Sequence, residues 1–340
     1  MKIGIVGASG YSGGELMRLL AVHPHFKLEY LAAGSNAGSQ ITAIHPHLSW
    51  LFDRSFDATS VTKINELDLV FLALPHGESA KLVPEIDSRV KIIDLGADFR
   101  LSSAGQWGKY YGGDYAGKWQ YGLPELPGVR AQICASTRIA NPGCYATSII
   151  LATAPALTNS LIDPSDIVVV ASSGTTGAGR SAKVNLLASE VMNSLTSYKF
   201  GGVHQHTPEI EESLSALTSK EVRISFTPIL APMPRGILAT ATAKLVTRIS
   251  EEEVRQLYVE FFENEKFVSI LPKGQLPKTS SVIGSNSTQL QIAVDEHTNR
   301  LIVSAAIDNL GKGAAGQAIQ NANLICGYEE SLALSENGMP

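Results

Sequence analysis

The first twenty residues carry the pattern that most restricts how this chain can fold. A short apolar run, residues 2–6, stops at a glycine-rich turn, and Leu16, Leu19 and Leu20 then recur at helical spacing. A strand, a glycine turn and a helix in this order are typical of a nucleotide-binding βαβ unit, in which the glycines let the backbone approach a pyrophosphate at the helix N-terminus. An ordinary strand-to-helix turn is the alternative, and the position at the very start of the chain favours the nucleotide site.

The end of the second expected strand bears on which dinucleotide is bound. About 20 residues past the glycines, a site specific for NAD usually carries an acid that binds the ribose 2′-hydroxyl. This chain has Gly34, Ser35 and Asn36 there, and no arginine at the strand end. Small polar groups accept a 2′-phosphate that a carboxylate would repel, so the sequence favours NADP(H), with Ser35 in the phosphate pocket.

Further apolar segments, residues 68–74 and 90–95, are bounded by turn residues and alternate with helical patterns. They predict a Rossmann-like, doubly wound parallel sheet of the α/β class. The turns that follow them, which contain Pro75 and Arg100, would lie at the carboxyl ends of the strands, where ligands bind. His76, in the first of these turns, is interpreted as a solvated loop residue.

Length and charge exclude several classes of function. A chain of 340 residues is long enough for two domains, and its net charge of -5 gives no basic field for nucleic acid or an acidic membrane. There is no apolar run of about 18 residues to span a bilayer, and motif residues begin by Gly7, which leaves no room for a signal peptide. The cysteine count is odd, without Cys-x-x-Cys spacing, which argues against disulfides and zinc. A cytoplasmic protein with reduced thiols is expected.

Cys144 is the candidate nucleophile. Asn141, Pro142 and Gly143 precede it and an apolar helical stretch follows, so Cys144 is expected in the first turn of a helix. The helix dipole and the unpaired N–H groups there favour the thiolate, and the same N–H groups can hold an oxyanion. The alternative, a buried inert thiol, is assigned to Cys134 and Cys326.

A nucleophilic thiol needs a base, and residues 202–210 supply His204 and His206. They directly precede an expected helix, with Thr207 as N-cap and Pro208 in the first helical position. Two histidines at i and i+2 are also a possible metal site. Since no cysteine or carboxylate lies at suitable spacing, an acid/base role is preferred to metal binding, and no metal is expected.

A second glycine-rich segment, residues 172–180, follows the expected strand 167–171. Its glycine N–H groups, its hydroxyls and an arginine suggest an anion site, and it lacks the Lys-Ser/Thr ending of an ATP-binding P-loop. A flexible linker is the alternative. The candidate residues here are Ser173, Gly174, Gly177 and Arg180.

The carboxyl-terminal half predicts a different architecture. Segments 222–226, 237–246, 289–294 and 301–307 read as strands, the last two as a hairpin. Ser250 and Glu253 form a capping box for a helix whose apolar face is expected in the core or a subunit contact. The result is an α+β domain with a mixed, largely antiparallel sheet. The expected domains are 1–143 plus 312–340 for NADP binding, and 144–311 for substrate binding and oligomerisation.

Taken together, these motifs resemble the type 1 N-acetyl-gamma-glutamyl-phosphate reductases, within the wider group that includes aspartate-semialdehyde dehydrogenases. The resemblance runs along nearly the whole chain, and the cysteine and double-histidine segments are its specific part. It implies that Cys144 is the nucleophile, that His204 or His206 is the acid/base, and that the turn at Pro75 and a late segment with Asn309 approach the nicotinamide. Gly177 is also expected among the cofactor-binding residues. It also implies a set of residues that bind the cofactor phosphates: Gly7, Ser9, Gly10, Tyr11, Ser12 and Gly13.

The implied activity is NADPH-dependent reduction of N-acetyl-gamma-glutamyl phosphate to the semialdehyde and phosphate through a cysteine thioester, in arginine biosynthesis. Arg100, Asn141, Ser173, Gly174 and Arg180 are the expected substrate-binding residues, and a homodimer or homotetramer is expected. The alternatives are a related reductase of aspartyl phosphate or carrier-linked aminoadipyl phosphate, and a redox-sensing NADP-binding protein without turnover. The chain departs from the family pattern at Ser39, where lysine is usual, at Ala146, where proline is more usual, and at residues 175–176.

Overall fold

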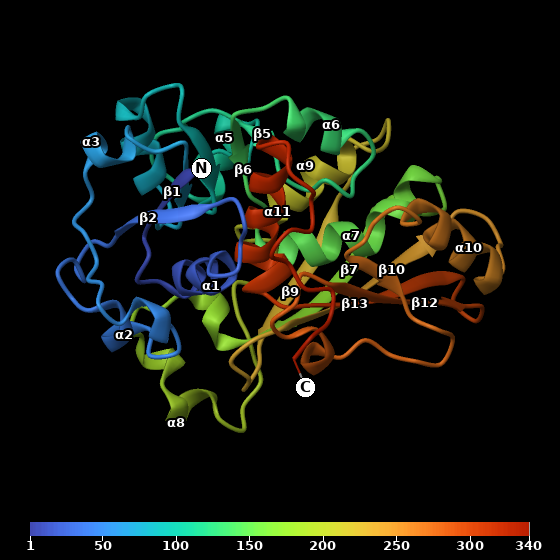
Figure 1. The fold of residues 1–340 in the computed structure, drawn as a ribbon. Coiled ribbons are helices and arrows are strands. Elements are labelled where there is room, and N and C mark those ends of the chain that lie inside the picture. Colours follow the sequence, from blue (N-terminus) through green and yellow to red (C-terminus); the bar gives the residue numbers. More distant parts are fainter. Residues whose placement is uncertain (340) are drawn as a thin grey trace. The chain divides into compact units, whose positions relative to one another are not determined.

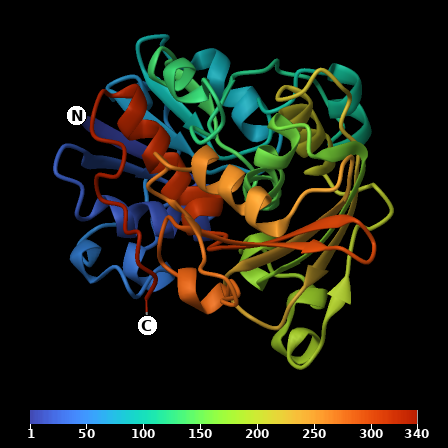
Figure 2. The same cartoon turned by 90° about the vertical axis from the view of Figure 1, so that its right-hand side faces the viewer.

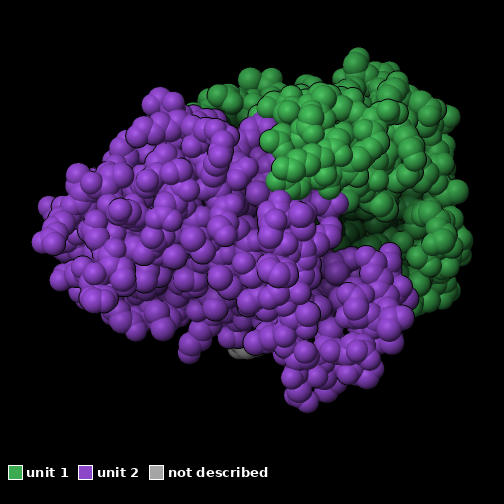
Figure 3. All heavy atoms as spheres, turned by 180° about the vertical axis from the view of Figure 1, so that it is seen from behind, with its two compact units in different colours: residues 1–124, 128–142, 314–334 green, residues 125–127, 143–313, 335–340 purple. Residues whose placement is uncertain are grey.

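The computed structural model describes residues 1–339, which divide into two compact units, coloured separately in Figure 3. Unit 1 comprises Met1–Pro124, Gly128–Pro142 and Ala314–Leu334, and unit 2 comprises Glu125–Pro127, Gly143–Gly313 and the residues from Ser335 onward. Among the described residues, there is no helix with the length and apolar character that a bilayer-spanning segment needs.

Unit 1 is built on a six-stranded sheet in which every strand runs parallel to its neighbours. The strand order is β2-β1-β3-β4-β6-β5, which extends in both directions from β1, so the predicted doubly wound parallel sheet is confirmed. Figure 1 labels β1, β2, β5 and β6 of this sheet. The strands are β1 (Lys2–Val6), β2 (Lys27–Ala32), β3 (Leu69–Leu72), β4 (Lys91–Asp94), β5 (Gln120–Tyr121) and β6 (Arg138–Ala140).

Apolar side chains cover both faces of this sheet. Successive residues of a strand point to opposite faces, and in β1 Ile5 belongs to one buried cluster with Leu16 and Ile319, whereas Val6 belongs to another with Phe99. Two separate cores, one on each side, are what a parallel sheet between helical layers requires. The helices of unit 1 are α1 (Tyr11–Leu20), α2 (Ile41–Ile44), α3 (Val61–Ile64), α4 (Glu78–Leu82), α5 (Ala104–Tyr110), α6 (Val129–Cys134) and α11 (Gly316–Ile325).

Unit 2 contains a seven-stranded sheet of order β11-β12-β13-β10-β7-β9-β8. The pairs β7–β9 and β11–β12 are parallel and the other pairs are antiparallel, which confirms the predicted mixed, largely antiparallel sheet. The predicted hairpin is β12–β13. The strands are β7 (Ile162–Ser173), β8 (Thr196–Ser197), β9 (Ile224–Leu230), β10 (Ile237–Leu245), β11 (Val268–Ile270), β12 (Thr288–Asp295) and β13 (Arg300–Ile307).

Helices pack on one face of the sheet of unit 2 (Figure 2). The helix α7 (Cys144–Thr158) contacts β7, β10 and β13, α9 (Thr207–Ser215) contacts β9, and α10 (Glu251–Phe261) contacts β12; the short α8 spans Ala188–Val191. The predicted capping box of α10 is present, with Ser250 and Glu253 each accepting from the other's backbone N–H. The helix α7 is buried along nearly its whole length, which fixes the position of its first residue.

Candidate active site

Cys144 is the first residue of α7, as predicted. Gly143 is the N-cap, with extended backbone and no side chain that caps the helix. The Gly143 N–H donates to the Oε1 atom of the buried Glu209 at 2.7 Å. The next N–H groups, of residues 144–146, are those that helix geometry leaves without an intrahelical acceptor. An oxyanion hole formed by N–H groups of this first turn stays a prediction.

Gly313 packs against the nucleophile candidate and leaves no room for a side chain. A Cβ atom at position 313 would lie 2.8 Å from the Cys144 Cβ and 3.3 Å from the Asp308 carbonyl oxygen. Gly313 lies in a single π-helical turn, Gly311–Ala315, a rare structure that is frequent at functional sites. The neighbouring Gly311 is equally confined, since a Cβ there would lie 2.1 Å from the Ser285 carbonyl oxygen. This turn therefore sets the space around Cys144.

We expect Gly313→Ala to lower kcat by about 10- to 100-fold, because the added methyl group must displace Cys144 and misplacement of a reacting group by about 1 Å can cost that much. Steady-state kinetics and circular dichroism of the purified variant check this. Gly108→Ala is the control, since a Cβ at Gly108 meets nothing within 4 Å. Wild-type kcat in the Gly313 variant would show that the close contact has no bearing on the reaction.

Buried charged groups hold the π-helical turn in place. The fully buried Asp308 accepts hydrogen bonds from Arg235 Nε at 3.1 Å and Nη2 at 2.5 Å, and from the Leu310 N–H at 2.9 Å. Lys312, within the turn, forms an ion pair with Glu125, and the side chains of both are almost fully buried. These residues and Glu209 were not assigned roles from the sequence, because a charged residue near a motif reads as a solvated one unless its burial is known.

The two histidines lie beside the residue that follows Cys144. The Tyr145 ring centroid is 5.4 Å from that of His204 and 6.0 Å from that of His206. The imidazoles are 5.0 Å apart, and the His206 backbone N–H donates to His204 Nδ1 at 3.1 Å. His204 is only 6% exposed and is also packed against Phe226. The structure thus places both predicted histidines against Tyr145, the residue that follows Cys144, in unit 2.

The predicted start of the helix after the histidines is wrong by one residue. The helix α9 begins at Thr207 with His206 as its N-cap, so Pro208 is in the second helical position. His206 already has helical backbone angles, φ −80° and ψ −11°, and its side chain makes no capping hydrogen bond. Threonine is a common N-cap residue, but here Thr207 lies inside the first turn of α9.

Burial sets the protonation state of the aromatic cluster. Desolvation, with smaller contributions from the charges of His206 and Lys199, lowers the pKa of His204 to about 2. Burial raises the pKa of Tyr198 to about 12 and raises that of Tyr145 further still. At neutral pH His204 is therefore a neutral imidazole between neutral phenols, and His206 is the less buried imidazole of the pair.

The pKa of His204 predicts how stability depends on pH. Between pH 6.5 and about 2 the unfolded chain holds a proton on His204 that the folded chain does not, so the free energy of unfolding falls as pH falls below 6.5. One such group contributes a slope of about 1.4 kcal/mol per pH unit. We expect urea unfolding of His204→Asn to show a shallower slope than wild type between pH 6 and 4.5. His297→Gln, in an exposed turn, is the control; parallel curves for wild type and His204→Asn would contradict the prediction.

The glycine-rich segment after β7 forms a turn whose N–H groups are already used. Those of Gly174, Thr175, Thr176 and Gly177 donate to the carbonyl oxygens of Gly236, Met233, Pro234 and Gly174, respectively. These four N–H groups therefore already have acceptors in the folded chain, and ligand binding by Ser173, Gly174, Gly177 and Arg180 stays a prediction. The Ser173 hydroxyl donates to the Gly174 carbonyl oxygen, and Arg180 follows the turn on an exposed stretch.

Asn309, expected near the nicotinamide, joins this turn to the residue before β10. Its Oδ1 accepts from the Gly236 N–H at 2.7 Å, and its Nδ2 donates to Thr176 Oγ1 at 3.0 Å. Because the side chain is buried, these contacts position the segment after β13 rather than present Asn309 to solvent.

In unit 1 the first glycine turn has the geometry of a phosphate site. Gly7 has φ +87°, and a Cβ there would lie 2.2 Å from the Ala73 carbonyl oxygen; a Cβ at Gly13 would lie 2.6 Å from that of Ala8. Gly10 caps α1 without a side-chain hydrogen bond. The helix N-terminus thus lacks a side-chain cap and is approached closely by backbone, and Ser9, Tyr11 and Ser12 lie in the turn and the first residues of the helix.

The other candidates of unit 1 occupy two kinds of place. Ser35 and Pro75 are exposed in the turns after β2 and β3. Arg100 and Asn141 are buried: Arg100 Nε donates to the Asn141 carbonyl oxygen at 2.8 Å, and Asn141 Nδ2 donates to the Ala314 carbonyl oxygen at 3.1 Å. Through these hydrogen bonds the two residues fix the chain near the ends of β4 and β6. Direct contact of Arg100 and Asn141 with the substrate stays a prediction.

The remaining cysteines differ from Cys144 in their surroundings. The prediction of a buried thiol is wrong for Cys134, which ends α6 and is exposed. Burial raises the pKa of Cys326, at the end of α11, to about 11. Neither is the first residue of a helix. In the described part of the chain, no three His, Cys, Asp or Glu side chains are grouped to hold a metal ion.

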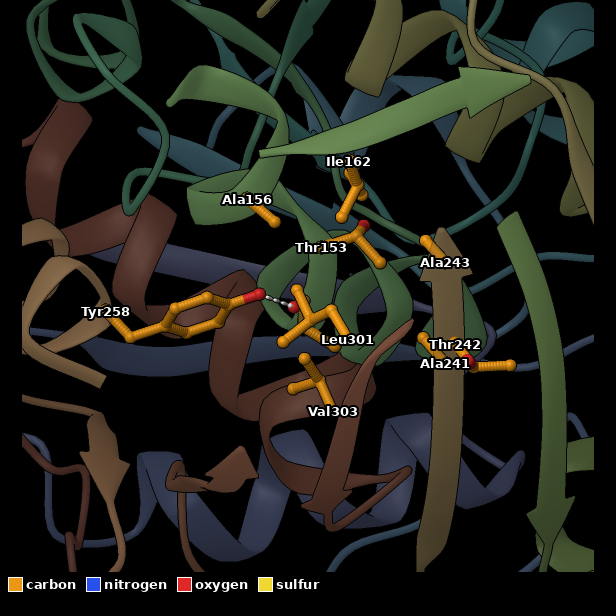
Figure 4. Close-up of a pocket in the computed structure, with 10 residues that line it drawn as sticks. Thr153, Ala156, Ile162, Ala241, Thr242, Ala243, Tyr258, Leu301 and Val303 are labelled. Carbon is orange, nitrogen blue, oxygen red and sulfur yellow. Dashed lines mark hydrogen bonds between the residues drawn. The ribbon is translucent and has the colours of Figure 1, made fainter. Parts of the chain in front are cut away.

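A small pocket lies along the second half of α7, away from its N-terminus (Figure 4). Tyr258 of α10 donates its hydroxyl to the Ala152 carbonyl oxygen at 2.8 Å at the pocket's edge. The lining is mostly apolar and contains no nucleophile or titratable group other than this tyrosine. We interpret it as a gap in the core between helix and sheet.

Comparison with known proteins matches both parts of the chain to one family. Residues 2–134 match the semialdehyde dehydrogenase NAD-binding domain, and residues 144–309 match the semialdehyde dehydrogenase dimerisation domain. The chain is 53% identical over 338 residues to the N-acetyl-gamma-glutamyl-phosphate reductase of Acidothermus cellulolyticus, covering 99% of this chain and 98% of the relative. It is 51% identical over 335 residues to that of Thermobifida fusca, covering 98% of each.

Solved structures with the same fold are more distant in sequence. Aspartate semialdehyde dehydrogenase II from Vibrio cholerae superposes with a TM-score of 0.71 at 17% identity, covering 96% of this chain and 98% of that one. The aspartate semialdehyde dehydrogenase from Candida albicans, solved with NADP, gives 0.70 at 15% identity, with coverage of 96% and 98%. At this identity the likeness concerns the fold.

Proposed function

We propose, because the chain belongs to the N-acetyl-gamma-glutamyl-phosphate reductase family of semialdehyde dehydrogenases, that it reduces N-acetyl-gamma-glutamyl phosphate to N-acetyl-glutamate semialdehyde and phosphate. This NADP-dependent, aldehyde-forming step belongs to arginine biosynthesis. The observation that carries the proposal is the position of Cys144 at the N-terminus of α7, next to Tyr145, which contacts both imidazoles.

The first step is acyl transfer to the thiolate of Cys144. The sulfur forms a bond with the acyl carbon, the bond from that carbon to the phosphate oxygen breaks, and phosphate leaves with its electron pair. The N–H groups of residues 144–146 face the carbonyl oxygen as it becomes negative. The product is a thioester, whose carbonyl accepts hydride more readily than a carboxylate does.

The second step is reduction of the thioester, after which the Cys144 sulfur leaves as a thiolate. When bound, the nicotinamide of the reduced cofactor supplies the hydride. His206 gives a proton to the tetrahedral oxygen and takes it back as the carbon–sulfur bond breaks, which releases the aldehyde and the thiolate. We assign this role to His206 because His204, with a pKa of about 2, stays neutral and holds the backbone of His206 through its Nδ1 atom.

The first glycine turn fits a dinucleotide cofactor. The N-terminus of α1, which no side chain caps, offers N–H donors to a pyrophosphate. Gly7 and Gly13, where a Cβ would strike the Ala73 or Ala8 backbone, let the turn pack closely enough to form this site. Ser35, in the exposed turn after β2, is the residue proposed to accept the 2′-phosphate of NADP(H). Pro75 lies in the turn after β3, whose Gly77 N–H is held by the Asp98 carboxylate at 2.7 Å.

We assign cofactor binding to residues 1–143 plus 312–340, and substrate binding and self-association to residues 144–311. The description of the matching domain and the exposed Val168 and Val170 on β7 support a homodimer or homotetramer. We place the protein in the cytoplasm, because a catalytic thiol must stay reduced.

The substrate is tested by the reverse reaction. Purified protein is mixed with NADP, phosphate and one of three semialdehydes: N-acetyl-glutamate, aspartate or carrier-linked aminoadipate semialdehyde. The proposal expects phosphate-dependent formation of reduced cofactor with the first and far less with the others. Preference for another semialdehyde would assign the chain to that reductase. No turnover with any of them, with retained cofactor binding, would favour a redox-sensing protein.

A further inference from the structure

One cation near the histidines is paired differently from the buried cations of the site. Arg235 forms an ion pair with Asp308, and Lys312 is likewise paired with a buried glutamate. Lys199 instead donates from Nζ to the neutral amide oxygen Oε1 of Gln205 at 2.7 Å. Within residues 1–339 it has no carboxylate partner. Its charge is therefore not neutralised by the protein.

The chain holds Lys199 beside the proposed acid/base pair. Gln205, which accepts its hydrogen bond, lies between His204 and His206 in the sequence. The preceding residue, Tyr198, donates its hydroxyl to the Tyr145 hydroxyl at 3.1 Å, and its ring centroid is 5.7 Å from that of His204. Both anchors of Lys199 thus belong to the cluster around the residue that follows Cys144.

The backbone at Lys199 is in an uncommon conformation. Its φ is +43°, in the left-handed region that non-glycine residues seldom occupy. Such conformations cost free energy, persist where the surrounding contacts hold them, and are concentrated at functional sites. Here the hydrogen bond of the preceding Tyr198 and that of the Lys199 side chain to Gln205 accompany the conformation.

A second ammonium group is close enough to act on Lys199. Desolvation and the nearby charge of Lys183 lower the pKa of Lys199, and the charge of Lys199 in turn contributes to the low pKa of His204. Lys183 also has no carboxylate partner within residues 1–339. Two ammonium groups that oppose each other's charge are both stabilised when an anion binds between or beside them.

We propose that Lys199 binds an oxyanion of the substrate. The inference rests on the proposed function, whose substrate carries a carboxylate at one end and a phosphoryl group at the other. The predicted alternative for anion binding, the N–H groups of residues 174–177, is engaged by carbonyl oxygens. Lys199 supplies a positive charge, which the N–H groups of this turn do not. The experiment below decides whether it binds the carboxylate or the phosphoryl group of the substrate.

The test is the reverse reaction of the full-length Lys199→Met variant, with the KM for phosphate and the KM for the semialdehyde measured separately. We expect one of the two to rise by about 10- to 100-fold, the range for loss of a charge-assisted hydrogen bond, with a much smaller change in kcat. A rise for phosphate identifies the phosphoryl group as the bound oxyanion, and a rise for the semialdehyde identifies the carboxylate. Lys199→Arg is expected to restore most of the affinity.

Lys220→Met is the matched control, because it removes an exposed lysine of unit 2 after α9. Unchanged KM values in Lys199→Met, or a loss confined to kcat, would overturn the inference while leaving the proposed function intact. Absence of phosphate-dependent turnover in the wild-type protein would instead overturn the proposed function, so the two failures are distinguishable.

Discussion

Cys144→Ser is expected to lose phosphate-dependent oxidation of the semialdehyde by at least about 10⁴-fold, the order of loss seen when a covalent nucleophile is removed from an enzyme. A hydroxyl at the start of α7 is not ionised by the helix N-terminus as a thiol is, and an oxygen ester accepts hydride less readily than a thioester. The measurement is the initial rate of formation of reduced cofactor at saturating substrates.

Binding of NADPH separates this loss from unfolding. The variant should bind the cofactor with nearly the affinity of wild type, because the proposed phosphate site is formed by the glycine turn before α1. Cys134→Ser, at an exposed cysteine, is expected to keep wild-type activity. Turnover retained by Cys144→Ser would rule out the covalent route.

Lys312→Met is expected to lower the free energy of unfolding by about 3–5 kcal/mol, the cost of leaving one charge of a buried pair without its partner. The side chains of Lys312 and Glu125 are 0% and 1% exposed, so water cannot replace the lost ammonium. Urea unfolding at pH 7 measures the change. Loss of activity should accompany it, because Lys312 precedes Gly313, which touches Cys144.

A double variant tests whether the ion pair itself is the cause. Lys312→Met combined with Glu125→Leu removes both charges and should recover much of the lost stability, since apolar replacement of a whole buried pair is often neutral. Lys81→Met, which breaks an exposed pair with Glu78, should leave the urea midpoint nearly unchanged. A single Lys312 variant as stable as wild type would contradict the structural account of the π-helical turn.

The sequence predicted the elements whose stability depends on local patterns. The strand, glycine turn and helix at residues 2–20 obey steric rules that only glycine satisfies at Gly7 and Gly13. The capping box at Ser250 and the hairpin β12–β13 likewise depend on residues close in sequence. Short strands such as β5 and β8, two residues each, have too few residues to show a period and were not predicted.

The site was predicted in part, because long-range contacts decide the rest. Cys144 could be placed at a helix start from its neighbours alone, but its packing against Gly313 depends on a residue 169 positions away (313 − 144). Nothing in the sequence shows that the N–H groups of residues 174–177 have acceptors. In the fold, the segment before β10 supplies the carbonyl oxygens for three of them, and Gly174 supplies the fourth. The burial of Asp308 and Lys312 could not be predicted either, because it also depends on contacts between residues far apart in the sequence.

The central claim is an acyl group carried on one sulfur, and mass spectrometry of the enzyme tests it most directly. The protein is incubated with N-acetyl-gamma-glutamyl phosphate without reduced cofactor, quenched in acid and digested. We predict one N-acetylglutamyl group on the peptide that contains Cys144, removable by hydroxylamine and absent from Cys144→Ser. An unmodified peptide in an enzyme preparation that turns over when NADPH is added would contradict the account.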